Sequence, residues 1–167
     1  MLPVGFQLAT TKLPLHLGGW LWSEKLDGVR AMWDGKSKMY SRNGLVLPAP
    51  KEFTAYFPKN LILDGELWID RNMFADTVSV IRTHSSWNMI QYKVFDCYSK
   101  KMKQYPYIDR FSYLTNFKDS LSLHPGRVVF PSTVSALLDT VVSKGGEGLM
   151  LRDASAVYSP GRTPFLV

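Results

Sequence analysis

The chain has 167 residues, of which 46% are hydrophobic and 20% charged, and its formal net charge is +6. This length and balance fit one globular domain with a buried core. No apolar run reaches the length of a transmembrane helix, and the N-terminus lacks the pattern of a signal peptide, so we expect an intracellular chain without membrane contact. The single cysteine, Cys97, excludes an intrachain disulfide and a cysteine-rich zinc site. The positive charge favours an anionic partner such as nucleic acid or a nucleotide.

The predicted elements alternate short strands with helices within one domain, 1–167. After an irregular lead-in over 1–20, the Asp34-Gly35 turn joins two strands in a hairpin, because this dipeptide favours tight turns. Ser132 is the expected N-cap of the last helix and Gly145-Gly146 its stop. Antiparallel-type strands with interspersed helices indicate an α+β fold. Strands are predicted over 29–33, 38–41, 61–63, 67–69, 89–98, 127–130, 148–152 and 165–167, and helices over 50–57, 74–82, 108–121 and 133–143.

The first candidate site is a cluster of charges between Lys25 and Arg30. Lys25 and Asp27 are two positions apart, so in an extended segment both side chains point to the same face. Gly28 permits a turn or a close approach of the backbone to a ligand. One short segment therefore presents an amine, a carboxylate and a guanidinium together. The alternative is a surface turn with three solvated charges, which a bare Lys-x-Asp-Gly does not exclude.

Two further clusters combine carboxylates with glycine. Asp64 and Glu66 flank Gly65 in an apolar run, and buried acids need a cation, a metal or a hydroxyl as partner. The alternative is a turn that interrupts the strand at these residues. Glu147 stands among three glycines before an apolar strand, where the backbone can approach a ligand closely. The alternative is a helix stop with a solvated glutamate.

Two single residues complete the set. Arg42, in the turn sequence Ser-Arg-Asn-Gly at 41–44, is of a type that binds phosphate, although an isolated arginine is more often a surface residue. Phe95 is suited to stacking on a base, although an isolated phenylalanine is more often part of the core.

In this order the clusters resemble the covalent nucleotidyltransferases, which comprise the ATP-dependent DNA ligases, the RNA ligases and the mRNA capping enzymes. Lys-Leu-Asp-Gly-Val-Arg at 25–30 looks like their first motif, and Ser-Arg-Asn-Gly at 41–44 like the next motif of the ligases. Asp-Gly-Glu-Leu at 64–67 looks like the third, Phe95-Asp96 like its aromatic companion, and Glu-Gly-Leu at 147–149 like the fourth. The resemblance runs from about residue 19 to the end, and its wording is most similar to the small bacterial ATP-dependent DNA ligases.

The resemblance implies a nucleotidyltransferase (ATP-grasp-like) fold, in which antiparallel sheets surround a nucleotide cleft. It also implies that Lys25 attacks the α-phosphate of ATP and carries AMP. AMP would then pass to the 5′-phosphate of a nick in double-stranded DNA, and the 3′-hydroxyl would displace it. Asp27 and Arg30 would be catalytic with Lys25. The implied nucleotide-binding residues are Glu24, Lys25, Arg30, Glu66, Phe95 and Glu147.

The same resemblance assigns the remaining partners. Arg42 would bind the 5′-phosphate of the nick, and Glu147 and Asp64 would hold Mg²⁺ or Mn²⁺, which neutralises the phosphates. The expected partner is nicked double-stranded DNA, bound by a monomer through phosphate contacts that do not depend on base sequence.

One departure from the family pattern lies at the end of the chain. The fifth motif, Lys-x-Lys, is expected after a Gly-Arg such as Gly161-Arg162, and this sequence ends at Val167 without it and without an OB-fold. Since those lysines act on the α-phosphate, we expect weak or no adenylylation by these residues alone. Three alternatives stay open: an RNA ligase, a capping guanylyltransferase, and a non-catalytic nucleic-acid-binding protein that retains the fold.

Overall fold

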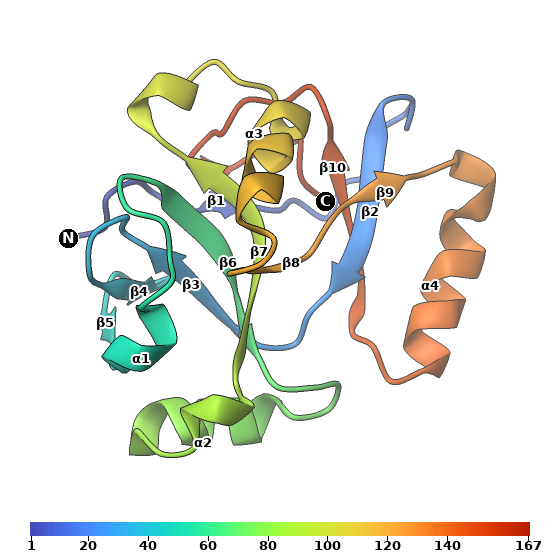
Figure 1. The fold of residues 1–167 in the computed structure, drawn as a ribbon. Helices are drawn as coiled ribbons and strands as arrows, with labels where there is room; N and C mark the ends of the chain where they lie inside the picture. Colours follow the sequence, from blue (N-terminus) through green and yellow to red (C-terminus); the bar gives the residue numbers. More distant parts are fainter.

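A computed structural model describes all 167 residues as two β-sheets that face each other across a gap, with helices on their outer sides (Figure 1). The larger sheet has the order β5-β4-β3-β6-β7-β8 and the smaller one β10-β2-β9. Pairing is antiparallel throughout both, except between β7 and β8. The larger sheet contains β3 (Val29–Trp33), β4 (Met39–Ser41), β5 (Val46–Leu47), β6 (Ile62–Trp68), β7 (Gln91–Tyr98) and β8 (Ser122–Leu123).

The smaller sheet contains β2 (Trp20–Lys25), β9 (Arg127–Val128) and β10 (Gly148–Asp153), and a separate parallel pair joins β1 (Gln7–Leu8) to β11 (Gly161–Arg162). The helices are α1 (Lys51–Thr54), α2 (Phe74–Thr83), α3 (Tyr107–Leu114) and α4 (Val134–Ser143). Figure 1 shows α3 crossing in front of β7, α2 beneath the larger sheet, and α4 on the outer side of the smaller sheet. This arrangement confirms the predicted α+β fold. No helix has both the length and the apolar composition needed to cross a bilayer.

The apolar core is divided between the two sheets. A cluster of 17 buried residues packs around the larger sheet, with Trp33, Leu63 and Val94 fully enclosed. The smaller sheet has its own cluster of four buried residues, Leu17, Trp20, Val129 and Leu151. The small cluster buries far less apolar surface, so the smaller sheet depends on polar contacts with the larger one for its position.

Strand β7 contains a β-bulge that decides which side chains face the gap. Asp64 pairs with Asp96 and the next residue, Gly65, pairs with Val94, so Phe95 is the extra residue. Tyr92, Val94 and Cys97 point into the large core, with a spacing of two and then three. Phe95 and Asp96 are therefore both turned away from that core.

The structure corrects several predicted boundaries. The segment 61–69 is not interrupted: β6 runs through Asp64 and Glu66, because β3 and β7 bind its backbone from both sides and override the turn preference of Asp-Gly. The helix expected over 108–121 ends at Leu114, where a 3-10 turn begins. Ser132 lies in a 3-10 turn and does not cap α4, which has no side-chain cap. The lead-in contributes β1, and 165–167 meets β10 through a single bridge at Leu166.

Candidate active site

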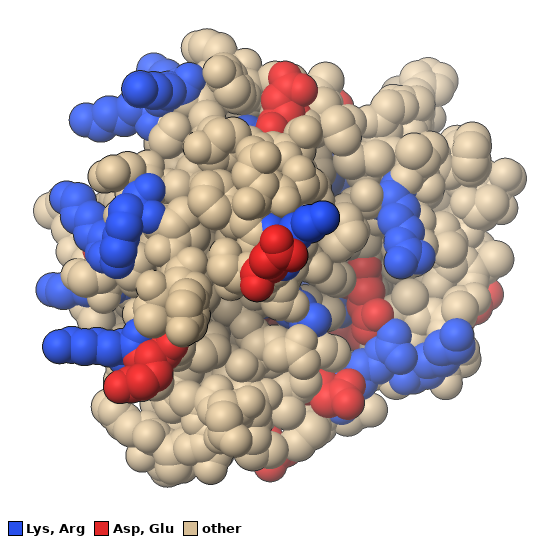
Figure 2. Space-filling model, viewed as in Figure 1, with Lys and Arg blue, Asp and Glu red and all other residues tan.

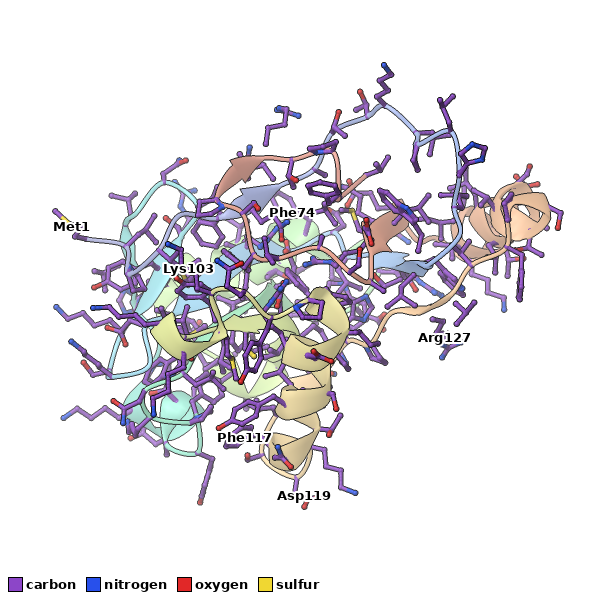
Figure 3. All side chains as sticks on the ribbon, turned by 90° about the horizontal axis from the view of Figure 1, so that it is seen from above. Met1, Phe74, Lys103, Phe117, Asp119 and Arg127 are labelled. Carbon is purple, nitrogen blue, oxygen red and sulfur yellow. The ribbon has the colours of Figure 1, made fainter.

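A cavity of about 340 Å³ lies between the two sheets, and both contribute to its wall. This volume falls in the range of small-molecule sites. Seen from above, the labelled Lys103 lies in the left half of the molecule and Arg127 in the right half (Figure 3). Most of the predicted site residues line this cavity, namely Glu24, Lys25, Arg30, Arg42, Glu66 and Phe95. The other predicted residues, Asp27, Asp64 and Glu147, lie outside its lining.

Lys25 is the last residue of β2 and the only lysine in the cavity wall. Its ammonium contacts the carboxylate of Glu147, and 44% of the lysine side chain and 37% of the glutamate side chain are exposed. The pairing of Lys25 with Gly148 across β2 and β10 brings the two together. Two predicted site residues that are 122 positions apart in the sequence are thus in direct contact, and both side chains are partly exposed to solvent.

The glycines before Glu147 set the direction of its approach. Gly145 has φ +80°, and the amides of Gly145 and Gly146 donate to the carbonyls of Val142 and Val141, which ends α4 as predicted. A Cβ on Gly146 would lie 2.8 Å from a carboxylate oxygen of Glu24. The turn over 145–147 therefore packs against Glu24, and its last residue, Glu147, contacts Lys25.

Arg30 is held rigidly at the back of the cavity. Its Nε and Nη2 donate to both oxygens of Asp64, at 2.7 and 2.9 Å, and its guanidinium lies 4.6 Å from the ring centre of Phe95. Asp64 is only 2% exposed and also accepts a hydrogen bond from the Tyr158 hydroxyl at 2.8 Å. Asp64 thus finds the cation and the hydroxyl that a buried acid requires. It does not line the cavity, although the resemblance assigns it to a metal ion beside the nucleotide.

Glu66 shares the cavity face of β6 and has an unusual proton affinity. Burial raises the pKa of its carboxyl to about 7, Arg30 opposes this shift, and the charge of Asp64 adds to it. A carboxyl with such a pKa is partly protonated near neutral pH, so it can donate as well as accept a hydrogen bond.

The other end of the wall contains residues that sequence reasoning missed. Asp96 is fully buried and accepts hydrogen bonds from Arg110 at 2.8 and 2.9 Å and from Arg152 at 2.7 Å. The guanidinium of Arg152 lies 4.5 Å from the ring centre of Tyr107, and both residues line the cavity together with Met150. The only sequence signals were that Asp96 is the second residue of the Phe95-Asp96 motif and that Arg152 follows the Glu-Gly-Leu motif by three residues.

Arg42 lies at the mouth of the cavity, in the turn between β4 and β5. It is exposed and forms no ion pair. Arg162 lines the same mouth and donates to the carbonyl of Ala9 at 2.7 Å. Figure 2 shows one face of the molecule, on which lysine and arginine side chains are most numerous on the left, with further ones at the centre and on the right and acidic side chains between them. The mouth therefore offers guanidinium groups to an anion approaching from solvent.

Asp27 lies in the segment between β2 and β3. Close packing fixes this segment, since a Cβ on Gly28 would lie only 2.3 Å from the carbonyl oxygen of Leu67. The charge of Asp27 contributes to the raised pKa of Glu66, so the two carboxylates are near each other.

Comparisons with known proteins agree with this geometry. The family described as "ATP dependent DNA ligase domain" matches residues 9–164. The chain is 30% identical over 156 residues to a DNA ligase of Haemophilus influenzae, covering 87% of this chain and 55% of that protein. It therefore spans about half the length of this curated relative.

Solved structures give the same result. A structure from a study of DNA binding by Lig E DNA ligases superimposes with a TM-score of 0.84 and 32% identity, covering 98% of this chain and 67% of that one. The Chlorella virus DNA ligase-adenylate superimposes with a TM-score of 0.74 and 23% identity, covering 94% and 63%, and supports the fold alone. By its sequence match and its fold, the chain belongs to the ATP-dependent DNA ligase domain family.

Proposed function

We propose that this chain is the nucleotidyltransferase domain of an ATP-dependent DNA ligase, in which Lys25 carries AMP from ATP to nicked double-stranded DNA. The observation that carries the proposal is the place of Lys25. It is the only lysine in the wall of a cavity that also offers the ring of Phe95, the carboxyl of Glu66 and, at its mouth, the free guanidinium of Arg42. An amine, a stacking surface and an anion-binding group are what AMP transfer requires.

In the first step, Nζ of Lys25 attacks the α-phosphorus of ATP. The new N–P bond replaces the bond to the β-phosphate oxygen, and pyrophosphate leaves. The ammonium must lose a proton before it can attack, and Glu147 is the carboxylate in contact with it. The half-exposed position of this pair leaves room for the phosphates beside the amine.

The cavity wall supplies the groups that hold the nucleoside. Phe95 is the stacking partner for adenine, because the bulge in β7 turns its ring toward the cavity. Glu66 hydrogen-bonds a ribose hydroxyl. Arg30 positions Phe95, because Asp64 holds the Arg30 guanidinium against the Phe95 ring, and its charge acts on the Glu66 carboxyl. Asp27 lies near Glu66 and helps to set the charge of that carboxyl.

The residues present fit a divalent cation that arrives with the nucleotide. No group of three or more His, Cys, Asp or Glu side chains forms a separate metal cage. Mg²⁺ in nucleotide enzymes is commonly bound by one or two carboxylates together with substrate phosphates. Glu147 is the accessible carboxylate at the reacting amine, and Mn²⁺ suits the same oxygen. Bound there, the cation would supply charge neutralisation on the phosphates. Asp64, saturated by Arg30 and Tyr158, acts as a positioning residue for Arg30.

In the later steps AMP moves to the DNA. The 5′-phosphate oxygen at the nick attacks the phosphorus of lysyl-AMP and restores the amine, and the 3′-hydroxyl then displaces AMP. Arg42 binds the 5′-phosphate from the mouth of the cavity, where its guanidinium has no other anion. The net charge of +6 supplies further contacts to phosphates. The protein acts as a monomer.

The test is self-adenylylation of the 167-residue chain with α-labelled ATP and Mg²⁺ over hours. The reaction is expected to be slow, because the Lys-x-Lys motif is not among these residues, so the readout is protein-bound AMP. One AMP should appear on Lys25, in a bond that acid cleaves and alkali does not. Lys25→Arg should still bind ATP but carry no label, since a guanidinium keeps its proton.

Several results would contradict the proposal. Label on a residue other than Lys25, or labelling of the Lys25→Arg variant at the wild-type level, would show that Lys25 is not the nucleophile. Labelling by GTP in preference to ATP would favour a capping enzyme, and transfer of AMP to all-RNA rather than all-DNA nicks would favour an RNA ligase. ATP binding without any label, in a chain extended to include the Lys-x-Lys motif, would favour a non-catalytic protein.

A further inference from the structure

Arg71, in the loop between β6 and α2, makes a set of contacts that the ligation chemistry above does not use. Its Nε and Nη2 donate to the two oxygens of Glu24, at 2.8 and 2.7 Å, and its Nη1 donates to the carbonyl of Lys144 at 3.3 Å. Glu24 precedes the nucleophile on β2, and Lys144 begins the turn that ends in Glu147. One guanidinium from the larger sheet therefore binds both parts of the smaller sheet that flank Lys25.

The surrounding packing shows that these contacts are close-fitting. The carboxylate of Glu24 lies against Gly146, where a Cβ would be 2.8 Å from its Oε1. The side chain of Asn72 lies against Gly145, where a Cβ would be 2.8 Å from its Nδ2. The loop of Arg71 and the turn before Glu147 thus approach each other along two adjacent residues. The fork-shaped guanidinium suits this place, because it binds a carboxylate through two parallel hydrogen bonds.

The contacts also give Glu24 a structural role. Both of its oxygens accept a hydrogen bond from Arg71, and part of the residue lines the cavity. Its role as a nucleotide-binding residue stays a prediction, and its bond to Arg71 is a second role, in holding the smaller sheet. Arg71 itself does not line the cavity.

We propose that Arg71 is a positioning residue that fixes the Lys25–Glu147 pair of the smaller sheet against the nucleoside-binding wall of the larger sheet. Glu66 and Phe95 belong to the larger sheet and Lys25 to the smaller one. Because the apolar core of the smaller sheet is small, polar contacts such as this one help to fix the position of that sheet. The proposal rests on the proposed function, because the geometry it protects is the in-line approach of Lys25 to the α-phosphate.

The test compares Arg71→Ala with Arg71→Lys and with Arg82→Ala, an exposed arginine in the last turn of α2 that serves as the matched control. Arg71→Ala should lower the rate constant of lysyl-AMP formation at saturating ATP by about tenfold to a hundredfold, since a misplaced reacting group costs this much. The ATP dissociation constant should change by less than about threefold, because Arg71 lies outside the cavity wall. Arg71→Lys should fall between, and Arg82→Ala should match wild type.

Two further readouts separate positioning from general loss of structure. Millimolar methylguanidinium should restore part of the rate of Arg71→Ala, and amide hydrogen exchange over 144–148 should become faster in this variant while exchange in β3 and β6 stays unchanged. Wild-type rates in Arg71→Ala would overturn the proposal, as would faster exchange throughout the chain without rescue. Where the 167 residues label too slowly, the rates are measured in a chain extended through the Lys-x-Lys motif. If that chain also forms no lysyl-AMP, the proposed function fails, and local exchange over 144–148 alone decides the role of Arg71.

Discussion

Replacing Asp96 with asparagine tests the polar connection between the two sheets. Asp96 on β7 is fully buried and balances two guanidinium groups, Arg110 on α3 and Arg152 on β10. Asparagine keeps the volume and removes the charge, so both arginines lose their counterion, and Arg110 is itself only 1% exposed. Removing one partner of a buried ion pair costs about 3–5 kcal/mol. A domain of this kind has a total stability of roughly 5–15 kcal/mol, so the variant should lose a large part of it.

Urea unfolding at neutral pH, followed by tryptophan fluorescence, measures this loss. The matched control is Asp109→Asn, the same change at an exposed position in the first turn of α3, which should cost no more than about 1 kcal/mol. A loss below about 1 kcal/mol in Asp96→Asn, with an unchanged dependence on urea, would refute the reasoning. It would show that the backbone carbonyls that already bind Arg110, those of Tyr105 and Ala156, suffice to hold the charge.

Three further changes test the cavity wall and the segment between β2 and β3. Burial raises the pKa of Glu66 from 4.5 to about 7, so the stability it contributes is complete below pH 4.5 and is lost as the pH rises through 7. Glu66→Gln should therefore gain up to about 3 kcal/mol relative to wild type between about pH 4 and pH 8 in urea titrations, and parallel pH profiles would contradict this. Arg42→Ala should leave the rate of lysyl-AMP formation within about twofold of wild type and slow AMP transfer to nicked DNA at least tenfold, because a charge-assisted phosphate contact is lost. A gel assay measures both steps, and equal loss in the two would argue against a phosphate-binding role for Arg42. Gly28→Ala should lower the free energy of unfolding by about 1–3 kcal/mol, because its methyl group would meet the Leu67 carbonyl, and a neutral effect would show that the 26–28 segment moves freely.

The short motifs that carry the family resemblance were sufficient to bring most of the candidate residues to one cavity. Lys25, Arg30 and Glu66 belong to short motifs whose residue types carry their own chemistry, and the cavity contains all three. The Asp34-Gly35 hairpin and the glycine stop of α4 follow from backbone preferences that act over a few residues. Both features depend only on residues that are close together in the chain, so a single sequence is enough to predict them.

The features that were not predicted depend on distant partners. Asp64 was expected to need a cation, a metal or a hydroxyl, and this expectation is met, but the identity of its partners was not predicted. The structure supplies Arg30 from 34 positions away and Tyr158 from 94, a choice that no local pattern contains. The binding of Glu24 by Arg71, 47 positions away, was missed for the same reason. The uninterrupted course of β6 likewise depends on two neighbouring strands that its own residues do not specify.

The single extra residue in β7 divides this strand into two halves. The positions whose side chains face the core are even-numbered in the first half and odd-numbered in the second. Before the bulge, even-numbered positions such as Val94 enter the core, and after it the odd-numbered Cys97 does. Deleting one residue at the bulge would restore strict alternation but force either the aromatic ring or the buried carboxylate to the wrong face. Substitutions elsewhere in β7 change one side chain at a time, whereas a deletion here would exchange the environments of a whole half-strand. The length of this strand is therefore as much a determinant of the cavity wall as the identity of its residues.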